Sequence, residues 1–136
     1  MTKAISRHWT IRVVSEGSDP LSVTIDDRPF DSGVPGQLGS VSPVEYLLIS
    51  IAACFALSCR MALTQRQLPA ASFHLTVVGS KALDPPSRLD TIDIEIQFPG
   101  NFAYDVDSII RQAKELCTVT NTLARPRQPE VRVRIG

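Results

Sequence analysis

The side chains in this chain that are best suited to carry out chemistry are its three cysteines, Cys54, Cys59 and Cys117. A cysteine thiolate is a nucleophile that can be oxidised to a sulfenic acid or joined in a disulfide. A buried cysteine can equally serve as a small apolar residue of the core, so a purely structural role is the competing interpretation. An odd number of cysteines argues against a framework of structural disulfides and leaves redox chemistry open.

The spacing of the cysteines limits how they can pair. Cys54 and Cys59 fall in one predicted helix, where five residues at about 1.5 Å rise place the Cα atoms roughly 8 Å apart, on different faces. An intact helix therefore prevents a disulfide between these two residues. Any redox pair within the chain needs Cys117.

Composition and the remaining motifs exclude several function classes. The 136 residues include 14 basic and 14 acidic side chains, so the net charge gives no basis for binding nucleic acid or an anionic membrane. His8 and His74 are isolated, so no metal site is expected. The glycine-rich segment 33–39 lacks the Lys-Ser/Thr pair of a phosphate-binding loop. The N-terminus has no apolar run behind its basic residues, so we expect a cytoplasmic protein.

The helix that holds the first two cysteines has a strong start signal. Ser42, Pro43 and Glu45 supply an N-cap, a first helical residue and the acid of a capping box, and the helix should extend to about Gln67. Its longest apolar stretch, 46–59, has 14 residues, fewer than the roughly 20 of a membrane span. Because this buried helix is apolar nearly all round in a short chain, we expect a second copy to cover part of it in a symmetric dimer.

Apolar and polar residues alternate, or recur at helical spacing, along the rest of the chain. The pattern predicts an N-terminal β-hairpin, two further antiparallel strands with one solvated face, an amphipathic second helix, a short third helix and a last strand. In chain order these segments are 9–15, 21–26, the long helix, 73–83, 89–98, 105–116, 117–124 and 131–135. The prediction is a single α+β domain, residues 1–136, with a mostly antiparallel sheet.

Two segments resemble the signature of the OsmC/Ohr family. Ser42-Pro43-Val44-Glu45-Tyr46-Leu47-Leu48, followed by Ala52-Ala53-Cys54, resembles the family's proline-initiated apolar helix with its first redox cysteine. Leu116-Cys117-Thr118-Val119-Thr120-Asn121-Thr122-Leu123 is similar to the family's Cys-Pro-Val-Ser-x-Thr-Leu segment. The resemblance spans residues 21–135 and implies an OsmC-like fold.

What the resemblance implies is a cysteine-based, peroxiredoxin-like peroxidase that reduces organic hydroperoxides, alkyl or lipid, under oxidative stress. It implies an intertwined homodimer with the two helices of each copy at its centre. Cys54 would attack the O–O bond and become a sulfenic acid, which Cys117 would capture as a disulfide. An external dithiol would reduce this disulfide. Neither a metal nor an organic cofactor is implied.

The chain departs from the family pattern in the groups that activate the first cysteine. The family's hydroperoxide-resistance enzymes use an arginine in a Gly-Gly-Arg turn and a glutamate directly after the helix-initiating proline, whereas here Val44 follows that proline and no such turn occurs. Glu45 is half a turn out of phase with Cys54 and is expected to act as the capping-box residue. Arg12 and Arg28 are the candidate cations for the thiolate.

Three functions are therefore compatible with the sequence. The first is the peroxidase, with an apolar pocket at the dimer interface to which the helix contributes Leu47, Ile51, Phe55 and Leu57. The second is an OsmC-like dimer that binds a small apolar ligand or senses redox state with little turnover. The third is a structural protein in which the cysteines belong to the core.

Overall fold

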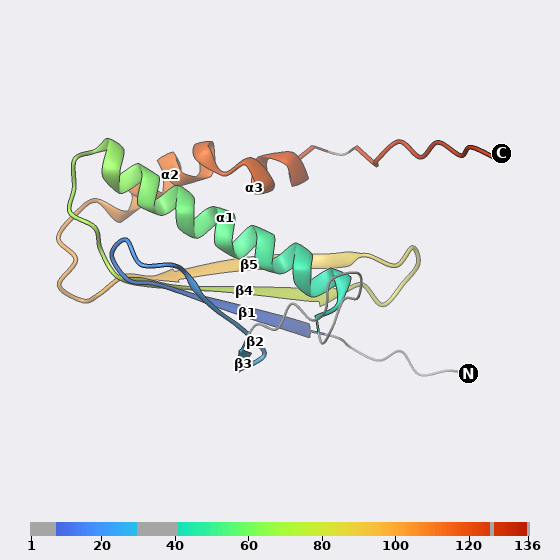
Figure 1. The fold of residues 1–136 in the computed structure, drawn as a ribbon, viewed down its shortest axis with the longest axis horizontal. Helices are drawn as coiled ribbons and strands as arrows, with labels where there is room; N and C mark the ends of the chain where they lie inside the picture. Colours follow the sequence, from blue (N-terminus) through green and yellow to red (C-terminus); the bar gives the residue numbers. More distant parts are fainter. Residues whose placement is uncertain (1–7, 30–40, 126, 136) are drawn as a thin grey trace.

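The fold is an antiparallel sheet with one long helix lying across it and two shorter helices beyond that helix (Figure 1). The computed structural model describes residues 8–29, 41–125 and 127–135. In chain order the elements are β1 (His8–Ser15), β2 (Ser22–Ile25), β3 (Arg28–Pro29), α1 (Pro43–Gln65), β4 (Phe73–Lys81), β5 (Leu89–Gln97), α2 (Val106–Leu116) and α3 (Thr118–Leu123). The predicted α+β class is confirmed.

The sheet has the strand order β3-β2-β1-β4-β5, and every neighbouring pair is antiparallel. On β1 and β4, Ile11 lies opposite Val77 and Val13 lies opposite Leu75, and all four side chains are fully buried. Because successive side chains point to opposite faces, these residues form one apolar face, while the exposed Arg12 points to the other. The sheet therefore has one buried face and one solvated face, as its alternation predicts.

Helix α1 covers the buried face of the sheet, and its start follows the predicted capping box. The Glu45 backbone N–H donates to Ser42 Oγ over 3.3 Å, and the Ser42 N–H donates to Glu45 Oε1 over 3.0 Å. Length and composition alone would allow α1 to cross a membrane, but half of its most apolar window is buried inside the protein. This burial is typical of a core helix.

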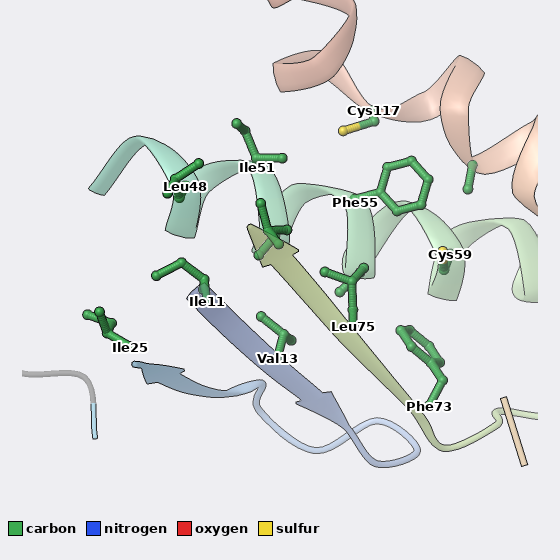
Figure 2. Packing of buried hydrophobic residues seen from close by; sticks show 14 of the residues in the cluster. Ile11, Val13, Ile25, Leu48, Ile51, Phe55, Cys59, Phe73, Leu75 and Cys117 are labelled. Atoms are coloured by element: carbon green, nitrogen blue, oxygen red, sulfur yellow. The ribbon is translucent and has the colours of Figure 1, made fainter. Parts of the chain in front are cut away.

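The core lies between α1 and the sheet, where Leu48, Ile51 and Phe55 of the helix belong to one buried cluster with the inward side chains of β1 and β4 (Figure 2). Gly79 of β4 allows a close approach of the two layers. A Cβ atom at this position would lie 3.0 Å from Leu48 Cδ1, and Leu48 is fully buried. The glycine therefore fixes how near the N-terminal half of α1 comes to the sheet.

One sequence-based expectation differs from the structure. Segment 131–135 is not a strand within the chain, because no described strand lies beside it to form hydrogen-bonded pairs. The short strand β3 follows a tight turn at Asp26 and Asp27, whose φ angles are +47° and +65°. Aspartate tolerates this conformation better than most residues. The glycine-rich segment 33–39 lies outside the described residues.

Removal of the helix cap provides a test of how α1 is anchored. We expect Ser42→Ala to lower the free energy of unfolding by about 1 kcal/mol, because the Glu45 N–H loses its acceptor. Urea unfolding followed by circular dichroism measures this change. Ser50→Ala is the matched control: Ser50 Oγ donates to the Leu47 carbonyl within the helix, where alanine is favoured. Equal losses in the two variants would contradict the capping role.

A candidate active site formed by two cysteines

Cys54 and Cys117 come from different layers of the helical side of the protein. Cys54 lies in the middle of α1, and Cys117 forms the junction at which α2 ends and α3 begins. The backbone of Cys117 is extended (φ −81°, ψ 99°), which separates the two helices. Figure 2 shows the Cys117 sulfur pointing from this junction toward the part of α1 that holds Ile51 and Phe55.

The structure brings the two cysteines together. The side chains of Cys54 and of Ser58, one helical turn later, lie near enough to the Cys117 thiol to lower its pKa. Ser58 Oγ donates to the Cys54 carbonyl over 2.8 Å, which holds the serine on the same face of α1. All three cysteines are free thiols, so this is a reduced arrangement.

The surroundings of Cys117 favour its thiolate. Burial raises the pKa of this thiol, but contacts with the side chain and backbone N–H of Thr120, and then with Cys54 and Ser58, lower it below the ordinary value. The Cys117 side chain has no hydrogen bond of regular N-cap geometry with α3. The low pKa therefore depends on several contacts from two helices together.

Cys59 has the opposite environment. It is fully buried in the core, and burial, together with the nearby charge of Cys117, raises the pKa of its thiol to about 12. The residue therefore stays protonated at neutral pH and packs as an apolar side chain. Because α1 is intact from Pro43 to Gln65, the predicted separation of Cys54 and Cys59 on different faces holds in the structure.

The two arginines proposed as cations for the Cys54 thiolate, Arg12 and Arg28, each form an ion pair with an acidic residue. Arg28 binds Glu45 at 2.6 Å, so the buried carboxylate of Glu45 joins β3 to the start of α1 in addition to its capping role. This pair lies at the helix start, nine residues or roughly 13 Å of helix before Cys54. Arg12 lies 3.7 Å from Asp27 on the exposed surface.

Arg60, in the same helix, also has a structural role. Its Nε donates to Ser15 Oγ, and its terminal nitrogen donates to the Asp19 carbonyl, both over 2.6 Å. These hydrogen bonds attach the second half of α1 to the end of β1 and the turn that follows. The arginine therefore holds the helix to the hairpin.

An apolar pocket of about 290 Å³ adjoins this region. Phe55, the residue after Cys54, forms one wall, and Lys114 is the charged residue of the lining. Of the four helix residues expected to form a pocket, only Phe55 lines this one: Ile51 is buried in the core, whereas Leu47 and Leu57 are exposed. The other lining residues come from β5, its end and α2: Ile94, Ile96, Phe98, Val106 and Ile110.

Ser58 and Thr120 are site residues that the sequence analysis did not identify. Ser58 is four residues after Cys54, a spacing that places both on one face of a helix, so helical phase could have found it. Thr120 follows Cys117 by three residues, the position at which a helix start presents a free N–H. In the described part of the chain, no group of three or more His, Cys, Asp or Glu side chains is arranged to hold a metal ion.

The contact between Ser58 and Cys117 gives a measurable change in pKa. We expect Ser58→Ala to raise the pKa of Cys117, because one of the contacts that stabilise the thiolate is lost. The Cβ chemical shift of Cys117 followed against pH measures this value. Ser50→Ala, on the exposed side of the same helix, should leave the titration unchanged. An unchanged Cys117 titration in Ser58→Ala would contradict the stabilising contact.

Comparison with known proteins assigns the chain to a family. The family model for OsmC-like protein matches residues 35–132. A crystal structure of an OsmC-like hydroperoxide resistance protein from Jannaschia sp. CCS1 has the same fold, with a TM-score of 0.66 and 16% sequence identity over 98% of this chain and 96% of that chain. No curated protein matches the chain. The predicted OsmC-like fold is thus confirmed, and the chain belongs to the OsmC-like protein family.

Proposed function

We propose that the protein is a thiol-dependent peroxidase that reduces organic hydroperoxides, alkyl or lipid, through Cys54 and Cys117. The observation that carries this proposal is the contact between the two reduced cysteine side chains, which come from positions far apart in the chain. A general role in peroxide chemistry is supported by the family and by the similar structure, which is described as a hydroperoxide resistance protein.

Exposure supports the assignment of the two roles. Cys54 is partly exposed, whereas Cys117 is fully buried. A peroxide that arrives from solvent therefore meets Cys54 first. The low pKa of Cys117 suits the second step, in which a thiolate must attack an oxidised sulfur.

The proposed reaction balances in three steps. The Cys54 thiolate attacks one oxygen of the hydroperoxide, the O–O bond breaks, and the alkoxide leaves as an alcohol after taking a proton. The Cys117 thiolate then attacks the Cys54 sulfenic acid, forms a disulfide and releases hydroxide, which takes a proton from the solvent to become water. An external dithiol reduces this disulfide by exchange and becomes oxidised itself.

A stripe of exposed residues on α1, with the partly exposed Cys54 among them, supports a homodimer. Leu47, Ser50, Cys54, Leu57 and Met61 follow one another at intervals of three and four residues, which is the spacing of a seam between two helices. The side chains of Leu57 and Met61 are about half exposed in the single chain. We infer that a second copy covers this stripe, so that Cys54 lies beside the interface.

A redox-sensing or ligand-binding dimer with little turnover is the second candidate. It is favoured because the two candidate arginines and Arg60 all bind other groups, and a peroxidase needs a cation that stabilises the attacking thiolate. Arg28 binds Glu45, Arg12 binds Asp27, and Arg60 binds Ser15 at the end of β1. In this case Cys54 would still oxidise and the apolar pocket beside Phe55 would still bind a ligand. Turnover with a dithiol distinguishes the two candidates.

Peroxide turnover tests the role of Cys54. With cumene hydroperoxide and a lipoyl-type dithiol, we expect Cys54→Ser to lower the rate at least about 100-fold, because a hydroxyl cannot replace the attacking thiolate. Loss of peroxide measures this rate. Cys59→Ser is the matched control and should keep turnover, because the Cys59 thiol is buried and protonated. A wild-type rate no higher than that of Cys54→Ser would contradict the enzyme and leave the sensing role.

The product of a single oxidation tests the role of Cys117. After one equivalent of hydroperoxide without reductant, we expect mass spectrometry to find a disulfide between Cys54 and Cys117 within one chain. In Cys117→Ser, oxidation should stop at a Cys54 sulfenic acid that dimedone traps. A Cys54 sulfenic acid that never forms this bridge in the wild type would contradict the resolving role.

A further inference from the structure

Hydrogen bonds between side chains join the end of α1 to α2. Arg66 Nε donates to Gln112 Oε1 over 2.6 Å, and a terminal nitrogen of the same guanidinium donates to the Ser108 carbonyl over 3.1 Å. Gln112 Nε2 donates in turn to Gln65 Oε1 over 2.6 Å. Because the donors of a guanidinium have a fixed planar geometry, Arg66 holds α2 at two points one helical turn apart. We refer to Gln65, Arg66, Ser108 and Gln112 as the clamp.

The clamp and the cysteine pair lie at two levels of one contact between helices. Helix α2 runs back along α1, so later residues of α2 meet earlier residues of α1 (Figure 1). Gln112 contacts Gln65 near the end of α1. Cys117, five residues after Gln112, lies near Ser58 and Cys54. At about 1.5 Å rise per residue, roughly 7.5 Å of helix separates Gln112 from Cys117, so a displacement of α2 at the clamp also moves Cys117.

The apolar contact between the same two helices does not by itself select their relative position. Ala62 and Leu63 of α1 pack with Ile109 of α2 in a small buried cluster. Apolar burial is non-directional, so it favours contact without selecting one position along the helix axis. Hydrogen bonds require defined distances and angles. The clamp therefore supplies directional contacts that the apolar cluster lacks.

We propose that the clamp positions the cysteine pair: it fixes where α2 lies along α1 and thereby holds the Cys117 sulfur within reach of Cys54. The inference rests on the pairing of these cysteines in the proposed function. A displacement of about 1 Å can slow a reaction between two groups about 100-fold. The hydrogen bonds of the clamp are exposed, so they add little to stability, and their main effect is on geometry.

Exchange with glutathione measures how well the two cysteines are placed, without any peroxide. Glutathione disulfide takes two electrons from Cys54 and Cys117, which form a disulfide, and two glutathione thiols are released. The equilibrium constant of this exchange is the effective concentration of one protein thiol toward the other. We expect Gln112→Ala to lower this effective concentration about tenfold, because Arg66 loses its side-chain acceptor on α2. The pKa of Cys117 should rise as well, since its sulfur moves away from Ser58.

Two further variants separate position from stability. Gln112→Glu should recover most of the effective concentration, because a carboxylate still accepts from Arg66. Arg111→Ala, at the exposed neighbouring position of α2, is the matched control and should leave the effective concentration unchanged. An unchanged value in Gln112→Ala, or an equal loss in Arg111→Ala, would overturn the proposal. A loss that follows the free energy of unfolding across the variants, measured in urea, would overturn it too.

Turnover of cumene hydroperoxide with a dithiol is measured in parallel. A lower effective concentration in Gln112→Ala, without turnover in the wild type, leaves the clamp standing and rejects the peroxidase. Wild-type turnover with an unchanged effective concentration in Gln112→Ala does the reverse. A wild type that forms no disulfide between Cys54 and Cys117 with glutathione would also overturn the positioning role.

Discussion

The contact between Cys54 and Cys117 depends on a helix that is buried on several sides at once. Helix α1 must pack on the sheet through Leu48, which lies against Gly79 of β4, and still present Cys54 and Ser58 to the α2–α3 junction. Because protein interiors are close-packed, a shift of α1 on the sheet would move both residues relative to Cys117. The position of α1 is fixed by Gly79, Arg28 and Arg60, so these residues help to place the cysteine pair although none belongs to it.

Local signals in the sequence predicted the framework well. The start of α1 follows from Ser42, Pro43 and Glu45 because capping depends on residues that are neighbours in the chain. The strands follow from alternation because burial of one sheet face imposes period two. The strand predicted at 131–135 was wrong for a physical reason: alternation describes a strand's side chains, whereas the strand itself requires a partner, which the single chain does not supply.

The candidate site could be predicted only in part. The sequence identified Cys54 and Cys117 through a family resemblance, but no spacing rule joins positions in different helices. The pair of Arg28 with Glu45 depends on a turn that folds β3 back toward the start of α1, which no local pattern encodes. Ser58 is different, since helical phase relative to Cys54 was sufficient to place it near the site.

The high pKa of Cys59 has a consequence for how oxidation is contained within the chain. With a pKa of about 12, about one Cys59 side chain in 10⁵ is a thiolate at pH 7. Thiol–disulfide exchange needs a thiolate, so a bridge between Cys54 and Cys117 would be protected from scrambling by the one other thiol in the chain. Only a reductant from outside the chain would then reduce this disulfide.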